Sequence, residues 1–273
     1  MTKAGAGDDD KESEFARELI ESGSDLAGAM TGAALGLLGG PVGVVGGAAA
    51  GVAIARVLKR VGADVKQRWL GPREEVRIGA AFTFTAAAIV QALNSGQAPR
   101  QDGFFEAVGG QRPAADDLLE GVLLKARDSY QEKKVPLLAN LYATIAFHEE
   151  ISAAHANHLL ELASRLTYRQ LVAMAVAFDG GNRSRLRQSD YRDDAEAISR
   201  LGLDGTGLIT EIYDLYQQGL ILDTTGSAWI SVADVNPGAM RLQGSGAVLG
   251  TAMNISGDIP EDDRATIYSL LRS

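Results

Sequence analysis

Residues 26–55 read LAGAMTGAALGLLGGPVGVVGGAAAGVAIA, and none of these thirty side chains is charged. An apolar stretch of this length meets the criterion for a membrane-spanning candidate. Nine of the residues are glycine. Each glycine in a helix interior costs roughly 1 kcal/mol relative to alanine, so nine would offset most of a typical domain's net stability of roughly 5–15 kcal/mol. Close packing of helices, in lipid or in an oligomer, would compensate for that loss, and we favour this interpretation.

The glycines recur at four-residue intervals in two series that differ by one position. The first series is Gly28, Gly32, Gly36 and Gly40, and the second is Gly39, Gly43, Gly47 and Gly51. Four-residue spacing places each series on one face of a helix, where another backbone can approach closely. We therefore predict a glycine zipper, in which these glycines form the packing faces between helices in the membrane or between protomers of a homo-oligomer.

Two other interpretations of the segment stay open: a buried hairpin in a soluble protein, and a flexible linker. A flexible linker would be polar and serine-rich, whereas this segment carries leucine and valine at many positions. Gly39-Gly40-Pro41 predicts a hinge, because proline is well suited to start a second helix. One straight helix would be about 45 Å long and each half about 22 Å, so a tilted span and a hairpin are both possible for a hydrocarbon core of about 30 Å.

The charge changes sign across this segment. Residues 1–25 hold eight acidic and three basic side chains, and we expect them to form an acidic arm. Residues 56–77 hold seven basic and three acidic side chains, and apolar residues recur there at helical spacing. This pattern predicts a basic amphipathic helix at a membrane border, within a membrane-insertion region over 26–70. The border residues would be Arg56, Lys59, Arg60 and Trp69, and the alternative is an ordinary surface helix.

Composition limits the compartment and the chemistry. The 273 residues include no cysteine and carry a net charge of −9. The lack of cysteine excludes disulfides and thiolate metal sites, and the acidic balance argues against general nucleic-acid binding. The acidic N-terminus differs from the basic start of a secretory signal. We expect a cytoplasmic protein that moves to the inner membrane on activation.

Beyond residue 70 the pattern predicts a mainly α fold in three parts. These are a helical body over 71–166, a winged-helix-like module with a small β ribbon over 167–259, and a tail helix over 260–273. Within the body, helices are expected at 72–94, 113–134, 136–147 and 153–165, the last with Ser152 as its N-cap.

The winged-helix-like module is predicted from three helices followed by a two-stranded ribbon. The helices are expected at 168–178, 190–200 and 206–218, the strands at 220–222 and 229–232 around Gly226, and a further helix at 245–253. The helix that would enter a DNA groove, 206–218, contains Glu211 and Asp214 but no arginine or lysine. Since DNA binding requires phosphate neutralisation, a protein partner is favoured over nucleic acid.

The sequence carries no motif for catalysis. Phosphate-binding, dinucleotide-binding, hydrolase and metalloprotease patterns are all absent. The cluster His148, His155 and His158 lacks the placed third ligand that a zinc site would need, and its role is open. The adjacent acids Asp116 and Asp117 are interpreted as charges at a helix N-terminus or on a solvated face. We therefore expect no enzyme, no catalytic residue, no metal and no cofactor.

A glycine-zipper segment followed by a helical body resembles bacterial pore-forming effectors of abortive-infection (phage-defence) systems. The resemblance covers residues 26–70 and rests on Gly28 to Gly51. It implies inactive storage, oligomerisation triggered by a protein partner (possibly a phage protein assembly), and permeabilisation of the membrane lipid. The alternatives are a soluble scaffold or regulator whose winged-helix-like module binds a partner protein or DNA, and a constitutive single-span membrane protein.

Overall fold

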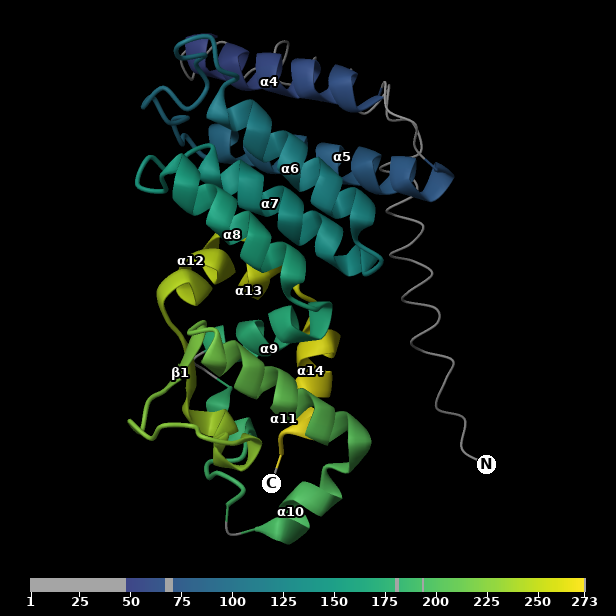
Figure 1. Cartoon of the computed structure of the whole chain (residues 1–273), viewed down its shortest axis with the longest axis vertical. Helices are drawn as coiled ribbons and strands as arrows, with labels where there is room; N and C mark the ends of the chain where they lie inside the picture. Colours follow the sequence, from purple (N-terminus) through teal and green to yellow (C-terminus); the bar gives the residue numbers. More distant parts are fainter. Residues whose placement is uncertain (1–47, 67–70, 180–181, 193, 273) are drawn as a thin grey trace. The chain divides into compact units, whose positions relative to one another are not determined.

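The computed structural model of the chain describes residues 48–66, 71–179, 182–192 and 194–272 (Figure 1). Within these ranges the protein is mainly α-helical, as predicted, with one two-stranded antiparallel sheet. The chain divides into two units. Unit 1 ends at Ser164, and unit 2 begins at Arg165.

Unit 1 is a helical bundle built around α7. Its elements are α4 (Ala48–Lys66), α5 (Pro72–Asn94), α6 (Ala114–Asp128), the 3-10 turn η1 (Glu132–Lys134), α7 (Val135–Ile145) and α8 (Ala153–Arg165). Eight of the eleven residues of α7 are buried. A helix that is apolar on every side is suited to a position inside a bundle, and α7 packs against both α5 and α6.

The limits of α5 and α8 agree with the sequence prediction. Helix α5 begins at Pro72, and the Glu74 carboxylate accepts a hydrogen bond of 2.7 Å from the Gly71 N–H. It ends before Gly96, whose positive φ of +82° favours glycine. At the start of α8, the Ser152 hydroxyl accepts a hydrogen bond from the backbone N–H of His155. Capping residues therefore predict helix ends well in this unit.

One predicted helix of unit 1 is wrong. The sequence predicts a continuous helix over 113–134, but α6 ends at Asp128, and Tyr130 is 82% exposed. Ser129 has an extended backbone, and the chain becomes helical again through η1 before α7. The Ser129 hydroxyl donates a hydrogen bond of 3.1 Å to the carbonyl of Gln131, and a local bond of this kind competes with continuation of the helix.

Unit 2 is organised around α9. Its helices are α9 (Tyr168–Phe178), η2 (Arg183–Arg185), α10 (Ala195–Arg200), α11 (Gly202–Gln217), η3 (Val232–Asp234), η4 (Pro237–Ala239), α12 (Gly244–Ala252), α13 (Ile255–Asp258) and α14 (Glu261–Leu270). The Thr167 hydroxyl accepts from the N–H of Gln170, whose amide oxygen accepts from the N–H of Thr167. This capping box starts α9, which then packs against α11, α12, α13, α14 and the second strand.

The small sheet pairs β1 (Ile221–Asp223) with β2 (Met240–Leu242) in antiparallel register. The sequence predicted β1 but placed the second strand at 229–232. That stretch is irregular chain leading into η3, and the observed second strand, β2, lies further along the chain. The Asp234 carboxylate accepts hydrogen bonds from the N–H groups of Ile230 and Ser231, which starts the 3-10 turn in place of a strand. The helix predicted at 190–200 is also shorter, since α10 begins at Ala195. The winged-helix assignment stays a prediction.

Candidate functional site

Most of the predicted membrane residues lie outside the described ranges. These are Gly28, Gly32, Gly36, Gly39, Gly40, Gly43, Gly47, Pro41 and Trp69. Gly51 lies in α4, and so do Arg56, Lys59 and Arg60. The predicted glycine faces therefore stay a prediction, and the structure bears on the helix that follows them.

Helix α4 is amphipathic, as predicted. Its apolar residues Ile54, Leu58, Val61 and Val65 are each at most 1% exposed, and the helix packs on α6 within unit 1. In Figure 1, α4 lies at one side of the bundle. Arg56 and Lys59 are exposed. The face that the sequence assigned to a membrane border is therefore buried in the protein.

An ion pair fastens α4 to α6. The Nη2 of Arg60 donates to Oδ1 of Asp116 at 2.7 Å, and the Nε of Arg60 donates to the other carboxylate oxygen. The Asp116 side chain is fully buried, whereas that of Arg60 is 47% exposed. A two-point bond between guanidinium and carboxylate is among the strong hydrogen bonds of proteins. The hydrogen bond to Asp116 raises the pKa of Arg60, so the guanidinium stays charged.

A second arginine completes this contact. The Nε of Arg112 lies 3.6 Å from Oδ2 of Asp116, and its Nη2 lies 3.7 Å from Oδ2 of Asp64 on α4. Arg112 also pairs with Glu120 on α6. We call the set Arg60, Asp64, Arg112 and Asp116 the α4 clasp. Arg112 therefore contacts a carboxylate on each helix. Along the clasp, positive and negative side chains alternate in the order Arg60, Asp116, Arg112 and Asp64.

A buried tyrosine, Tyr142, lies close enough to the clasp to be affected by the charge of Asp116. Tyr142 on α7 is fully buried, and its hydroxyl has no hydrogen-bond partner among the described residues. Burial, and then the charge of Asp116, raise the pKa of Tyr142 well above its ordinary value. The neutral phenol cannot balance the Asp116 charge, so Arg60 and Arg112 are the groups that do.

The sequence interpretation of Asp116 is corrected by this geometry. Asp116 does lie in the first turn of α6, as expected, but it is fully buried and does not belong to a solvated face. Its neighbour Asp117 is 59% exposed and fits the expectation. Asp116 shares a helix face with Leu119 and Leu123, which are fully buried. This position on an apolar face was the signal that could have identified it.

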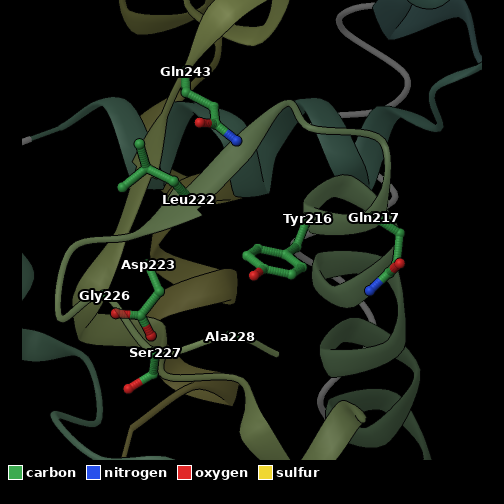
Figure 2. A pocket seen from close by; sticks show the side chains of 8 residues that line it. All are labelled: Tyr216, Gln217, Leu222, Asp223, Gly226, Ser227, Ala228 and Gln243. Carbon is green, nitrogen blue, oxygen red and sulfur yellow. The ribbon is translucent and has the colours of Figure 1, made fainter. Parts of the chain in front are cut away.

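A second polar site lies in unit 2, beside β1 (Figure 2). A cavity of about 510 Å³ is bordered by residues that include Tyr216 and Gln217 of α11, Asp223 of β1, and Ser227 and Gln243. The Asp223 carboxylate accepts from the Thr225 N–H at 2.6 Å and from the indole Nε1 of Trp229 at 2.8 Å. We call residues 224–239, which connect β1 to β2, the wing loop.

Helix α11 and the wing loop offer few basic groups to a phosphate backbone. The residues of α11 include no arginine or lysine, and Glu211 is bound to Arg169 by hydrogen bonds of 2.9 and 3.0 Å. The exposed residues of the wing loop, 224–228 and 230–232, are uncharged. The preference for a protein partner over nucleic acid stays a prediction.

The histidines do not converge on a site. His148 lies 2.5 Å from a carboxylate oxygen of Glu150, and the rings of His155 and His158 are stacked at 6.3 Å. Among the described residues there is no group of three histidine, aspartate or glutamate side chains placed to hold a metal ion.

One described helix, α5, is long and apolar enough to cross a membrane. Half of its apolar window is buried inside unit 1, and core helices of soluble proteins have the same length and composition. Helix α5 therefore does not decide between a membrane and a soluble protein.

Comparison with protein-family models, with curated proteins and with solved structures finds no match to this chain.

Proposed function

We propose that this protein is a conditional membrane-permeabilising effector, of the kind that bacteria use against phage. In the stored state, unit 1 holds α4 by the clasp. A protein partner then triggers the release of α4 together with the glycine-rich stretch that precedes it, and several copies assemble in the inner membrane.

The observation that carries this proposal is the way in which α4 is held. An amphipathic helix whose first eight residues, 48–55, end the uncharged stretch of thirty residues has its apolar face buried and is fastened through one buried carboxylate. An apolar face of this kind is also what binds the interface of a bilayer. The exposed side chains of Arg56 and Lys59 would then meet anionic headgroups, which attract basic residues near a membrane.

In the assembled state, the glycine series would supply the helix contacts. Glycine lets two backbones approach closely, which is how helices associate in lipid, where the hydrophobic effect does not drive them together. Pro41 would mark the hinge between two halves of the inserted segment, and Trp69 would lie at the membrane border. The charged residues from Arg56 onward would stay on the cytoplasmic side.

The second candidate is a soluble scaffold in which residues 26–55 form a buried hairpin. The uncharged exposed residues of the wing loop and the lack of basic residues in α11 favour a protein partner for unit 2 over DNA. This candidate predicts that the protein is harmless when expressed and needs no detergent.

The deciding experiment expresses the full chain and a version without residues 26–55 in bacteria, and follows growth and membrane potential with a voltage-sensitive dye. Both are tested with and without phage, because a stored effector is silent until it is triggered. Depolarisation that requires residues 26–55 supports the effector. An unchanged potential in every condition supports the scaffold.

A pair of matched variants tests the glycine faces. Gly43→Leu with Gly47→Leu fills one face, and we expect it to abolish depolarisation while the protein still folds. Val42→Leu with Val45→Leu enlarges neighbouring apolar side chains without filling that face and should preserve depolarisation. If the glycine variant still depolarises cells, the zipper is wrong.

A further inference from the structure

The cavity beside β1 borders a buried carboxylate that no arginine or lysine among the described residues pairs with. Three aspartates are buried in the described residues: Asp116, Asp223 and Asp234. Asp116 binds Arg60, and Asp234 lies 2.5 Å from the Nε of Arg192. Asp223 differs from both, because its donors are the Thr225 N–H and hydroxyl and the Trp229 indole, all of which are neutral.

Asp223 also borders an open space. Its side chain belongs to the lining of the cavity, and it is the one charged residue among those that line it. Figure 2 shows the carboxylate on one side of the cavity and Tyr216 and Gln217 of α11 on the other. A buried carboxylate is normally paired with a cation, so the lining provides a place for a cation that the described part of the chain does not supply.

The other walls fit the same chemistry. The ring of Tyr216 stacks on Trp229 at 4.6 Å between ring centroids and also lines the cavity. An aromatic face attracts guanidinium and ammonium groups. Gln243 uses its Nε2 to bond the carbonyl of Ile221, so its amide oxygen is the part of the group suited to accept a donor. A guanidinium presents five such donors in a plane.

We propose that this cavity binds the guanidinium or ammonium group of an arginine or lysine side chain from a protein that docks on unit 2. The carboxylate of Asp223 supplies the charge, Tyr216 the aromatic wall, and the two glutamines the neutral acceptors. This site stands independently of membrane insertion by unit 1. If the proposed function holds, the protein bound here is the trigger, and it presents a basic side chain to the wing loop.

The indole N–H of Trp229 is a direct reporter, since it donates to Asp223. The chain has two tryptophans, so Trp69→Phe in the full-length protein leaves one indole resonance to observe by NMR. The probe is N-acetylarginine methylamide, and the control is N-acetylcitrulline methylamide, which has nearly the same shape without the charge. We expect a saturable shift with the arginine probe, and binding at least tenfold weaker with citrulline.

A gain-of-function variant keeps the test independent of folding. Gln217 is exposed and lines the cavity, so Gln217→Glu adds a second carboxylate there and gives up only the 3.5 Å hydrogen bond from its Nε2 to the carbonyl of Trp229. We expect it to tighten binding of the arginine probe threefold to tenfold. Gln218→Glu makes the same charge change at the next exposed residue, outside the lining, and should change binding less than twofold.

Three outcomes would overturn the site: equal shifts with arginine and citrulline, equal effects of the two glutamate variants, or no shift at all. Spermidine is titrated in parallel, because a free polyamine carries the same ammonium chemistry. If spermidine binds more tightly than both the arginine probe and its lysine counterpart, the cavity takes a small polyamine, and the proposal of a protein side chain is wrong.

Discussion

Two buried aspartates, one in each unit, organise their surroundings in different ways. Asp116 is bound by Arg60, which is 56 positions away in the sequence and lies on another helix. Asp223 is bound by Thr225 and Trp229, two and six positions away in the same loop. The first carboxylate holds one helix against another, whereas the second gives one loop its shape. Loss of the first would free a whole helix, and loss of the second would loosen a single loop.

Lys134 is a buried cation and extends the comparison beyond the two aspartates. The largest change in unfolding free energy is expected for this residue. Its Nζ donates to the carbonyl of Ser164, and burial lowers its pKa to about 8 from 10.5. Between these two pH values the unfolded chain binds more protons than the folded protein, so stability rises with pH. We expect the unfolding free energy to gain up to about 3 kcal/mol between pH 8 and pH 10.5, relative to Lys134→Met.

Urea denaturation of both proteins from pH 7 to pH 10.5 measures this difference. Lys133→Met, a less buried neighbour, should follow the pH profile of the unaltered protein. Parallel profiles for the unaltered protein and Lys134→Met would mean that Lys134 keeps its ordinary pKa when folded.

Arg60→Ala tests the clasp in unit 1. The change leaves the buried Asp116 with Arg112 at 3.6 Å as its remaining cation. Removing one partner of a buried pair typically costs about 3–5 kcal/mol, and the half-exposed position of Arg60 reduces this to about 2–3 kcal/mol. Amide hydrogen exchange in α4 should accelerate by roughly 30-fold or more. Lys59→Ala, at the adjacent exposed position, should leave exchange in α4 unchanged.

This experiment separates the clasp from the membrane proposal. Faster exchange in α4 without any gain in leakage from lipid vesicles would support the role of the clasp in holding α4 and would count against membrane insertion. Unchanged exchange in α4 would show that the apolar face holds the helix without the ion pair.

Asp223→Ala tests the opposite case in unit 2. It leaves the N–H of the buried Trp229 indole without its acceptor, which costs about 1–3 kcal/mol. We expect faster exchange of that indole proton and of the wing loop, with no change in α4. Ser227→Ala, an exposed change in the same loop, is the control. If exchange in α4 accelerates as well, the comparison between local and long-range carboxylates fails.

The smallest effect is expected from Tyr142→Phe. The Tyr142 hydroxyl is buried without a hydrogen-bond partner, so its removal should be neutral or should raise stability by up to about 1 kcal/mol. Thermal unfolding measures this change. A loss of more than about 1 kcal/mol would show that the hydroxyl contributes a bond that stabilises the clasp.

Helix ends were predictable from the sequence where a local residue sets them. Ser152 and Thr167 cap α8 and α9 through bonds to residues three positions away, so a short window contains all the information. The strand predicted at 229–232 failed although its residues favour a strand. The Asp234 carboxylate accepts from the backbone N–H of Ile230, and the Trp229 indole donates to Asp223. These hydrogen bonds outweigh the intrinsic preference of the residues for a β-strand.

The sequence predicted the apolar face of α4 but not the residues that pack against it. The spacing of Ile54, Leu58, Val61 and Val65 predicted the apolar face of α4, because helical periodicity is a property of the sequence. What covers that face was not predictable, because lipid and a neighbouring helix accept the same residues. Asp116 could not be assigned to Arg60, since no local pattern connects positions that lie 56 residues apart.

The order of these residues in the sequence also determines when the clasp can form during synthesis of the protein. Arg60 leaves the ribosome 56 residues ahead of Asp116. At a synthesis rate of roughly 5–20 residues per second, α4 exists for roughly 3–11 seconds before its carboxylate partner has been made. During that interval its apolar face is open to a chaperone or to the membrane surface. Slow translation between codons 61 and 116 would lengthen the interval, so synonymous codon changes there would lower the share of protein that reaches the stored state.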